Sequence, residues 1–494
     1  MSRALLVLGL LLGLAALPAT LSRAQGADPG SLQERIDRAA PGDEIYVEGG
    51  LFRENILIDK PLSLVGVDWP VIDGGGEGDP LTVAADDVVV SGFIIRNSSR
   101  TISKEPAAVK ADGVDRLRLR GNRIEDSQYG IHITDSRDDI IENNIVDLGS
   151  AVPIERRGHA IYLWQVENTA VHGNTIRNAA DAIHLEFSDS NGIGLNTVVD
   201  SRYALHFMYS HGNRVVENTF RRNLAGAVIM YSHETVLRDN ELSENRKGAT
   251  GTGILLKDCD NVFVEGNRIL RNKYGITVDT TPQGKGATAV FMRNLFAFND
   301  TGVGAMSNAP ITFVENAMIE NTVQVKALGG NLAALAHSES GHGAGVTGED
   351  ARAPTGATWT VEGRGNYWSD YNGFDADGDG VGDRPYEPQP PFAGGLAENE
   401  TLRFFNFTLA QEAIDMAAEM FPVYRYQPVI EDSGPLMSAP GPALPRSTGP
   451  NSGLLTVGAL LVLLAGATLQ AVGALDAVAP LQRLVSTGRR NPVG

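Results

Sequence analysis

Short runs of alternating polar and apolar residues recur at a fixed interval along this chain. Between residues 174 and 242 an asparagine recurs every 22 residues, and an apolar residue follows two positions after each one. The asparagines are Asn174, Asn196, Asn218 and Asn240, and the apolar residues are Ile176, Val198, Phe220 and Leu242. A period of this length is typical of a solenoid, and short β-type runs in each period favour strands. Leucine-rich repeats share the length but need several leucines per unit, which these units lack. The expected fold is therefore all-β, a right-handed parallel β-helix of about 22 residues per coil.

The interval continues in both directions, with insertions at some steps. The step that ends at Asn174 is 30 residues long because of an insertion around residues 153–157, and the two steps to Asn267 and Asn294 are each 27 residues long. Asparagine tolerates a left-handed backbone, and its amide can hydrogen-bond to the equivalent amides above and below. We therefore expect an asparagine ladder at one corner, with the alternating apolar positions pointing into the core.

The two ends of the chain carry signals of export and of membrane insertion. An uncharged apolar run from Ala4 to Leu17 is followed by small residues typical of a cleavage site, which predicts a secretory signal peptide. Residues 453–475 carry no charge and are long enough to span a bilayer. Arginines are more frequent after that segment than before it, so the positive-inside rule places the tail in the cytoplasm and the solenoid outside. The predicted localisation is periplasmic, with an inner-membrane anchor.

Between these ends the sequence divides into further segments. A capping box at Ser31–Glu34 predicts a short helix that covers the first coil. The predicted segments are a signal peptide (1–24), the parallel β-helix (25–328), a flexible insertion loop (329–363), the C-terminal end of the β-helix with an Asp-rich loop and a helix (364–426), a Pro-rich tether (427–452), a transmembrane helix (453–475) and a cytoplasmic tail (476–494).

Net charge and cysteine content exclude some classes of function. The formal net charge of −19 argues against nucleic acid as a partner, because phosphate binding needs a basic face. Cys259 is the only cysteine, so no intramolecular disulfide can form and no zinc-finger arrangement is available.

Equal offsets from the repeating asparagine should stack, and this brings soft donors together. His184 should lie beside His206, Met208 beside Met230, and His211 beside His233, with neighbouring strands about 4.8 Å apart. Their apolar neighbours in sequence point inward, so alternation predicts that these side chains point outward. The resulting patch consists of His184, Glu186, His206, Met208, His211, Met230 and His233.

Imidazole and thioether together form a donor set that suits copper, above all Cu(I). We therefore hypothesise that the patch handles copper transiently. Two other interpretations remain open at this stage. The patch could be an apolar surface where a partner docks, or it could be the ordinary stacking of one histidine per coil.

A second candidate cation site lies in an Asp-rich loop. Asp375, Asp377, Asp379 and Asp383 occupy positions 1, 3, 5 and 9 of an EF-hand-type loop, and Gly380 occupies position 6. Oxygen ligands at this spacing suit Ca²⁺. Position 12 is Tyr386 rather than glutamate, so a tight Gly/Asp turn without an ion is the alternative.

Several stretches of the chain resemble the NosD family of periplasmic proteins. They read IYLWQVENTAVHGNTI, ALHFMYSHGN, GNYWSDYNGFDADGDGVGDRPY and FPVYRYQPVIEDSGPLM. The resemblance implies an accessory protein for nitrous-oxide reductase maturation that docks on the ATPase and membrane subunits of an ABC transporter. It also implies a copper chaperone and nitrous-oxide reductase as partners, and His206, Met208 and His211 as copper contacts. The 329–363 insertion and the C-terminal membrane helix depart from what we would assume for the family.

The resemblance implies a non-enzymatic role, and no catalytic residue is expected. The chain has no phosphate-cradling GxxxxGK[ST] loop, so ATP would be hydrolysed by a partner. The alternative is a carbohydrate-binding or polysaccharide-modifying enzyme (lyase, epimerase or hydrolase) on the same fold. Glu186, Asp181 or Asp189 would supply carboxylates, and Trp164 and Tyr162 would stack a sugar.

Overall fold

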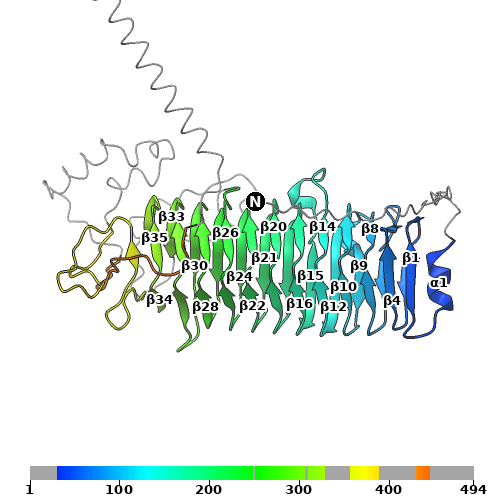
Figure 1. Cartoon of the computed structure of the whole chain (residues 1–494), viewed down its shortest axis with the longest axis horizontal. Coiled ribbons are helices and arrows are strands. Elements are labelled where there is room, and N and C mark those ends of the chain that lie inside the picture. The colour runs from blue at the N-terminus through cyan, green and yellow to red at the C-terminus, as the bar shows by residue number, and fades with distance from the viewer. Residues whose placement is uncertain (1–29, 249–250, 306–309, 329–355, 389–429, 445–494) are drawn as a thin grey trace, which may run out of the picture. The chain divides into compact units, whose positions relative to one another are not determined.

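The computed structural model describes residues 30–248, 251–305, 310–328, 356–388 and 430–444. Within these residues the chain forms three parallel sheets of 12, 13 and 12 strands, and each sheet takes every third strand in sequence order. The chain therefore winds once through all three sheets per coil, which confirms the predicted parallel β-helix. Figure 1 shows the coils side by side, from β1 next to α1 at one end to β35 at the other.

The first strand of each coil belongs to the first sheet. Its strands are β1 (Glu44–Glu48), β4 (Ser63–Val67), β7 (Val89–Ser91), β10 (Arg118–Arg120), β13 (Ile140–Glu142), β16 (Ala170–His172), β19 (Gly192–Gly194), β22 (Arg214–Val216), β25 (Val236–Arg238), β28 (Val262–Glu265), β31 (Ala289–Met292) and β34 (Ile311–Val314). Most of these strands bury their central residue and expose its two neighbours, as alternation requires.

The second sheet follows the corner at which the repeating asparagines lie. Its strands are β2 (Leu51–Phe52), β5 (Val71–Asp73), β8 (Ile94–Arg96), β11 (Arg123–Glu125), β14 (Ile145–Asp147), β17 (Thr175–Arg177), β20 (Thr197–Val199), β23 (Thr219–Arg221), β26 (Glu241–Ser243), β29 (Arg268–Leu270), β32 (Leu295–Ala297), β35 (Ala317–Ile319) and β37 (Tyr367–Trp368).

The third sheet has the longest strands and carries the predicted patch. Its strands are β3 (Ile56–Ile58), β6 (Leu81–Val83), β9 (Ala107–Asp112), β12 (Tyr129–Arg137), β15 (Ile161–Glu167), β18 (Asp181–Glu186), β21 (Tyr203–Met208), β24 (Ala225–Met230), β27 (Thr252–Lys257), β30 (Tyr274–Asp279), β33 (Thr301–Ala305) and β36 (Val323–Ala327). Two short 3₁₀ helices, Ile102–Lys104 and Ile154–Arg156, lie in loops that enter this sheet.

The asparagine ladder forms as the sequence predicts. The main-chain and side-chain N–H groups of Asn196 both donate to Asn218 Oδ1, at 2.9 and 3.0 Å, and the same pattern joins Asn218 to Asn240. The expected left-handed backbone lies one residue earlier, at positions such as Leu195 and Glu217, where φ is 57° and 56°. The prediction was wrong on this point because the tight corner precedes the asparagine, whose amide is then turned into the coil.

A second ladder, not noticed in the sequence, lies five residues further along each coil. Asn223, Asn245, Asn272, Asn299 and Asn321 are joined by the same bonds, with N···Oδ1 distances of 2.9 to 3.0 Å. These two ladders satisfy buried backbone groups at both ends of the short second-sheet strands.

The helix α1 (Leu32–Arg38) closes the first coil and confirms the predicted N-terminal cap. Ser31 accepts the N–H of Glu34, and Leu32 and Ile36 are buried in the core. Gln33 donates to Leu57 O at 3.0 Å and accepts from Leu57 N at 2.7 Å, so the helix satisfies an exposed strand edge. From the capping box the sequence predicts a helix that runs to Ala40, whereas the observed helix ends two residues earlier, at Arg38.

The far end of the stack is closed by segments that return from later in the chain. Trp359, in the predicted flexible insertion, is buried and stacks on Phe313 with ring centroids 4.6 Å apart. Asp432, in the predicted tether, is fully buried and accepts from Asn366 N at 2.7 Å and Trp368 Nε1 at 2.9 Å. The described parts of these two segments, residues 356–363 and 430–444, therefore contribute to the packed end of the stack.

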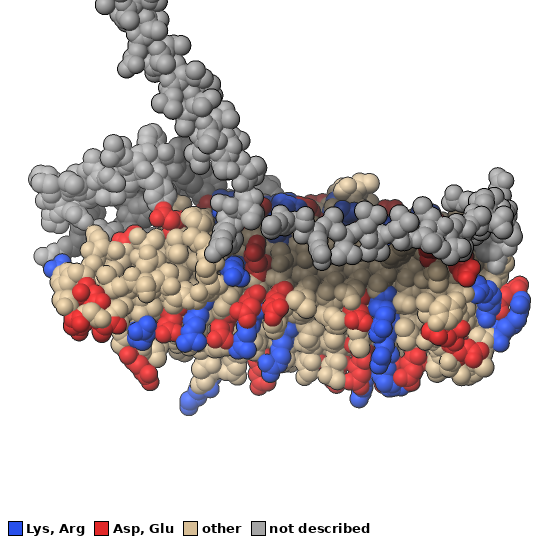
Figure 2. Space-filling model, in the orientation of Figure 1, with Lys and Arg blue, Asp and Glu red and all other residues tan. Residues whose placement is uncertain are grey.

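Charged side chains on the outer surface pair across neighbouring coils. Arg238 lies 2.8 Å from Glu265, and Arg293 lies 2.9 Å from Glu315. Figure 2 shows basic and acidic side chains next to one another along the stack. This surface has no single-sign field that would select a polyanion.

The membrane predictions concern parts of the chain that the structure leaves undescribed. The signal peptide (1–24), the helix at Gln411–Met420, the transmembrane segment (453–475) and the tail (476–494) all lie outside the described residues. Among the residues that are described, no helix is long and apolar enough to cross a membrane.

Candidate metal centre

The strand register of the third sheet confirms the rows expected from the repeat. His184 pairs with His206, and Met208 pairs with Glu186 on one side and Met230 on the other. The rings of His184 and His206 stack with centroids 4.5 Å apart. Ile183, Leu185, Leu205 and Phe207 enter the core, so the two histidines face away from it. Their role as copper ligands stays a prediction.

The patch is less exposed than its sequence suggests. His184 and His206 are 6% and 8% exposed, whereas Met208 and Met230 are half-buried. The prediction of outward-facing side chains is right in direction, but these imidazoles are buried. Neighbouring rings pack against them: the ring centroids of Tyr162 and His184 lie 5.0 Å apart, and those of Tyr203 and His206 lie 5.3 Å apart in a T-shaped arrangement.

A buried carboxylate lies beneath the two imidazoles. Asp181 is fully buried, and its Oδ2 lies 2.9 Å from His206 Nδ1. Its Oδ1 accepts from Arg202 Nε at 3.0 Å and lies 2.9 Å from Arg202 Nη2. Burial alone would raise the pKa of Asp181, but the hydrogen bond from His206 and the charge of Arg202 outweigh it and hold the pKa well below its usual value.

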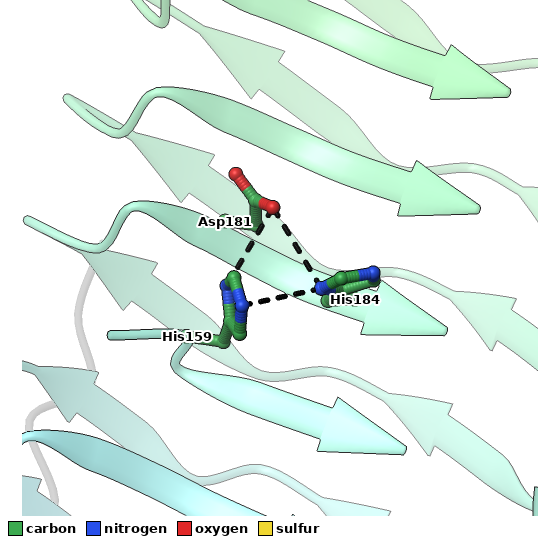
Figure 3. Close-up of side chains that lie close together, drawn as sticks. All are labelled: His159, Asp181 and His184. Carbon is green, nitrogen blue, oxygen red and sulfur yellow. Dashed lines mark hydrogen bonds and ion pairs between the residues drawn. The ribbon is translucent and has the colours of Figure 1, made fainter. Parts of the chain in front are cut away.

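A third histidine, His159, completes this cluster from the preceding coil. Figure 3 shows His159, Asp181 and His184 converging, with His159 on a neighbouring coil and the other two on β18. His159 Nδ1 lies 3.5 Å from Asp181 Oδ2, and His159 Nε2 lies 3.3 Å from His184 Nδ1. Burial lowers the pKa of His159 to about 4 and that of His184 well below its usual value, so both rings are neutral at pH 7.

The outer nitrogens of the two stacked imidazoles differ from the inner ones. His184 Nε2 and His206 Nε2 are buried, and neither has a hydrogen-bond partner among the residues that the structure describes. A buried polar atom without a partner is costly, and in native proteins it usually marks a function or an unseen ligand. Two imidazole nitrogens beside a row of thioethers fit Cu(I) by the chemistry of the donor set.

The triangle of His159, Asp181 and His184 fits an ion less well. Its donor atoms lie within 4.8 Å of one another, which is close enough for shared coordination. However, Arg202 and His206 already occupy the two oxygens of Asp181. A cation at the triangle would lie close to the Arg202 guanidinium, so this cluster is better suited to orienting the histidines than to holding a metal.

Of the other predicted ligands, His211 and Glu186 already have partners, whereas His233 Nδ1 is buried and has no hydrogen-bond partner among the described residues. His211 stacks on His233 with centroids 4.7 Å apart, as expected, but His211 Nδ1 accepts the main-chain N–H of His233 at 3.1 Å. Glu186 accepts from Tyr162 Oη at 2.8 Å. Cys259 is buried, and burial raises the pKa of its thiol to about 12, so it does not offer a thiolate.

The Asp-rich loop brings three of its four predicted ligands together. Carboxylate oxygens of Asp375, Asp377 and Asp379 lie within 4.8 Å of one another, whereas Asp383 accepts from Ala376 N at 2.7 Å. The other carboxylates also accept main-chain N–H groups, as in the bond from Gly380 N to Asp375 Oδ2 at 2.9 Å. Asp377 and Asp379 each accept the N–H of the residue two positions further on, as in Asx turns. Calcium binding stays a prediction.

The sequence analysis missed His159 and Arg202 and named Asp181 only for sugar chemistry. The eight-residue insertion before His159 hides its place in the repeat. Correcting for the insertion would have placed His159 seven positions after its corner asparagine, in the same row as Asp181.

This is thus a parallel β-helix with a buried cluster of histidines on the outer face of one sheet. A family model described as "Periplasmic copper-binding protein (NosD)" matches residues 148–373. "Probable ABC transporter binding protein NosD" of Pseudomonas aeruginosa is 34% identical over 89% of this chain and 97% of that protein. The protein of the same name from Stutzerimonas stutzeri is 33% identical over 79% of this chain and 86% of that protein. The chain belongs to the NosD family.

The chain is also similar, at low sequence identity, to several solved structures. A periplasmic alginate epimerase, AlgG, is 15% identical, covers 56% of this chain and 70% of its own, and has a TM-score of 0.39. A PL6 alginate lyase in complex with a trisaccharide is 15% identical, covers 61% and 85%, and has a TM-score of 0.43. Likenesses this distant say nothing about chemistry.

Proposed function

We propose that this protein is a periplasmic accessory protein that handles copper during maturation of nitrous-oxide reductase and docks on an ABC transporter. Copper is its cargo rather than a resident cofactor. The observation that carries the proposal is the pair of buried, unpartnered Nε2 atoms of His184 and His206 beside the row of Met208 and Met230. The names of the relatives and of the family support the transporter and the copper.

The donor set favours transient binding of Cu(I). Neutral imidazole and thioether are soft ligands that do not select a hard cation such as Mg²⁺. Burial keeps His184 neutral at pH 7, so no proton competes with the metal there. A row of donors across adjacent coils, with the half-buried Met208 and Met230 on its outer side, also lets an ion leave towards a partner, which a closed cage of four ligands would not.

We further propose that the protein is not an enzyme and that its C-terminal segment (453–475) anchors it to the inner membrane. Transporter, copper chaperone and nitrous-oxide reductase would then meet it on the periplasmic side. The ionised state of Asp181 supports the absence of catalysis. A carboxylate whose pKa lies well below its usual value is a weak base, and Arg202 and His206 occupy both of its oxygens.

The direct test is the copper content of nitrous-oxide reductase made in cells that carry a His184→Gln/His206→Gln variant. We expect the reductase to be produced with little copper at its catalytic site, whereas a His172→Gln control supports full loading. His172 lies on the first sheet with its side chain 39% exposed. Normal copper loading with the double variant would contradict the proposal.

The alternative function is tested by turnover of polysaccharides. Tyr162 and Glu186 form a hydrogen-bonded pair that a sugar enzyme could use. A panel of uronate and neutral polysaccharides should give no products with the wild-type protein. Product formation that disappears in Glu186→Gln would favour a lyase, epimerase or hydrolase instead.

A further inference from the structure

The two nitrogens of each imidazole in the histidine cluster have different surroundings, and the copper proposal alone does not explain this difference. In His184 and His206 the contacts with Asp181 lie on the Nδ1 side and Nε2 has no partner among the described residues, whereas in His159 the atom without a partner is Nδ1. A neutral imidazole carries one proton, and only the nitrogen without that proton can bind a metal. The position of the proton therefore decides whether His184 and His206 can act as ligands.

For His206 the proton position follows from Asp181. An ionised carboxylate only accepts hydrogen bonds, so the 2.9 Å contact from His206 Nδ1 to Asp181 Oδ2 requires a proton on Nδ1. In the neutral ring, Nε2 is then left with its lone pair. Metal-binding histidines are commonly oriented by such a carboxylate on the opposite nitrogen.

For His184 the position of the proton depends on Asp181 indirectly, through the ring of His159. His159 Nδ1 lies 3.5 Å from Asp181 Oδ2 and makes no hydrogen bond among the described residues, but a lone pair there would face the carboxylate, so the negative charge favours a proton on Nδ1. His159 Nε2 then accepts from His184 Nδ1 at 3.3 Å. The reverse arrangement would place two lone pairs against the carboxylate, because His184 Nδ1 also lies 3.7 Å from Asp181 Oδ2.

Arg202 determines how the side-chain amide would be oriented if Asp181 were replaced by asparagine. Its guanidinium donates only, and it binds Asp181 Oδ1 through Nε at 3.0 Å. If Asp181 became asparagine, the amide oxygen would stay with Arg202 and the NH₂ group would face His206. His206 Nδ1 would have to accept, and the proton would move to Nε2, where it blocks a metal.

We propose that Asp181 and Arg202 are positioning residues that lock His206, and through His159 also His184, in the Nδ1–H tautomer with Nε2 free for Cu(I). This inference rests on the proposed copper function of the two histidines. The locking itself is a property of the metal-free protein, so it can be tested without copper.

The first arm of the test reads the tautomers directly. Nitrogen-15 spectra of the full-length, metal-free protein labelled at histidine distinguish protonated from unprotonated ring nitrogens, and His184→Gln and His206→Gln assign the signals. We expect Nδ1 protonated and Nε2 unprotonated in both rings of the wild type. A proton on Nε2 of His206 would overturn the lock, even if copper binds.

The second arm uses Asp181→Asn, with Asp139→Asn as a matched control. Asp139 is also buried and also accepts a main-chain N–H, from Leu117 at 2.8 Å, but it lies outside this cluster. We expect Asp181→Asn to invert the His206 tautomer and to weaken Cu(I) binding about 10–100-fold, and the control to change neither. An unchanged tautomer in Asp181→Asn would overturn the role of Arg202.

A rescue separates locking from a general structural role. In Asp181→Asn/Arg202→Met the amide can turn its oxygen to His206, so the wild-type tautomer and most of the Cu(I) affinity should return. A damaged fold would not recover in this way. If Asp181→Asn does not fold, the wild-type spectra still test the proposed tautomers of His184 and His206. Wild-type tautomers as stated without any Cu(I) binding would leave the lock intact and overturn the proposed function.

Discussion

The first asparagine ladder and the histidine row of the third sheet both run along this molecule, and they differ in how completely their hydrogen bonds are satisfied. In the asparagine ladder, each amide nitrogen donates to the amide oxygen in the next coil and to a main-chain carbonyl, as when Asn196 bonds to Asn218 and Val171 O. In the histidine row, His184 and His206 stack in the same register but leave Nε2 without a partner in the described part of the chain.

The difference shows how a repeat protein separates structure from function. Identical amides can satisfy one another indefinitely because each is both donor and acceptor. Neutral imidazoles in a parallel stack cannot, because equivalent atoms lie beside one another. A stack of histidines therefore leaves its lone pairs available, and Asp181 determines which side they face.

The largest effect should come from breaking the structural ladder. Asn218→Ala removes the acceptor of two N–H groups of Asn196 and the donor to Ile193 O, all buried. Leaving such groups unsatisfied should cost about 4 kcal/mol of unfolding free energy, measured by urea denaturation. The exposed Asn55→Ala is the control and should change stability little. If Asn218→Ala lowered the unfolding free energy by less than about 1 kcal/mol, the ladder would not be a main source of stability.

The next effect is a loss of stability in acid that depends on His132. Burial, with the nearby charge of Lys110, lowers the pKa of this ring to about 4 in the folded protein, whereas in the unfolded chain its pKa is close to the ordinary histidine value of 6.5. The unfolded state therefore binds more protons between these values. The contribution of neutral His132 is present above pH 6.5 and lost as the pH falls towards 4, by about 3 kcal/mol.

Thermal unfolding of wild type and His132→Gln between pH 4 and 7 measures this dependence. The variant should lose part of the acid sensitivity, whereas His172→Gln, with its side chain 39% exposed, should keep it. If the unfolding temperature fell equally with pH in wild type and in His132→Gln, the buried ring would not be responsible for the acid sensitivity.

A smaller effect is expected from the thioether row. Met208→Ala with Met230→Ala removes the soft donors next to the imidazoles and should weaken Cu(I) binding about tenfold, or 1.4 kcal/mol, in a competitive titration. Val228→Ala is the matched control, since Val228 lies in the row of His206 but offers no donor. Unchanged affinity in the methionine variant would remove the thioethers from the site.

The smallest effect should come from the outer ion pairs. Arg238 and Glu265 lie 2.8 Å apart on neighbouring coils, with the arginine side chain 47% exposed. Arg238→Gln should change the unfolding free energy by about 0.5 kcal/mol or less, and less still at high salt, because water screens the pair. A cost comparable to that of Asn218→Ala would mean that surface charge, rather than buried amides, holds the coils together.

Much of this architecture could be predicted because the repeat has a constant length. Counting from the corner asparagine placed His184 beside His206 and Met208 beside Met230, as the strand register confirms. The capping box at Ser31 was sufficient to predict the helix that closes the first coil. Local sequence determines these features, because a strict period fixes which residues lie above one another.

The remaining features depend on contacts that no period encodes. Burial of His206 follows from rings of neighbouring coils, and its bond to Asp181 joins residues 25 apart rather than 22. His159 enters the cluster after an insertion that obscures its register. Asp432 returns from far along the chain to bond Asn366 at the end of the ladder. Such diagonal and long-range contacts are visible only in three dimensions.

The central claim is that an unpartnered nitrogen, rather than the presence of a histidine, defines the copper site. Competitive Cu(I) titration of His206→Gln and His211→Gln tests it most directly, because both histidines stack in the same part of the molecule but His211 Nδ1 is already occupied by His233 N. We predict that His206→Gln weakens Cu(I) binding about 100-fold and His211→Gln less than about twofold. Equal losses, or a larger loss for His211→Gln, would contradict the account.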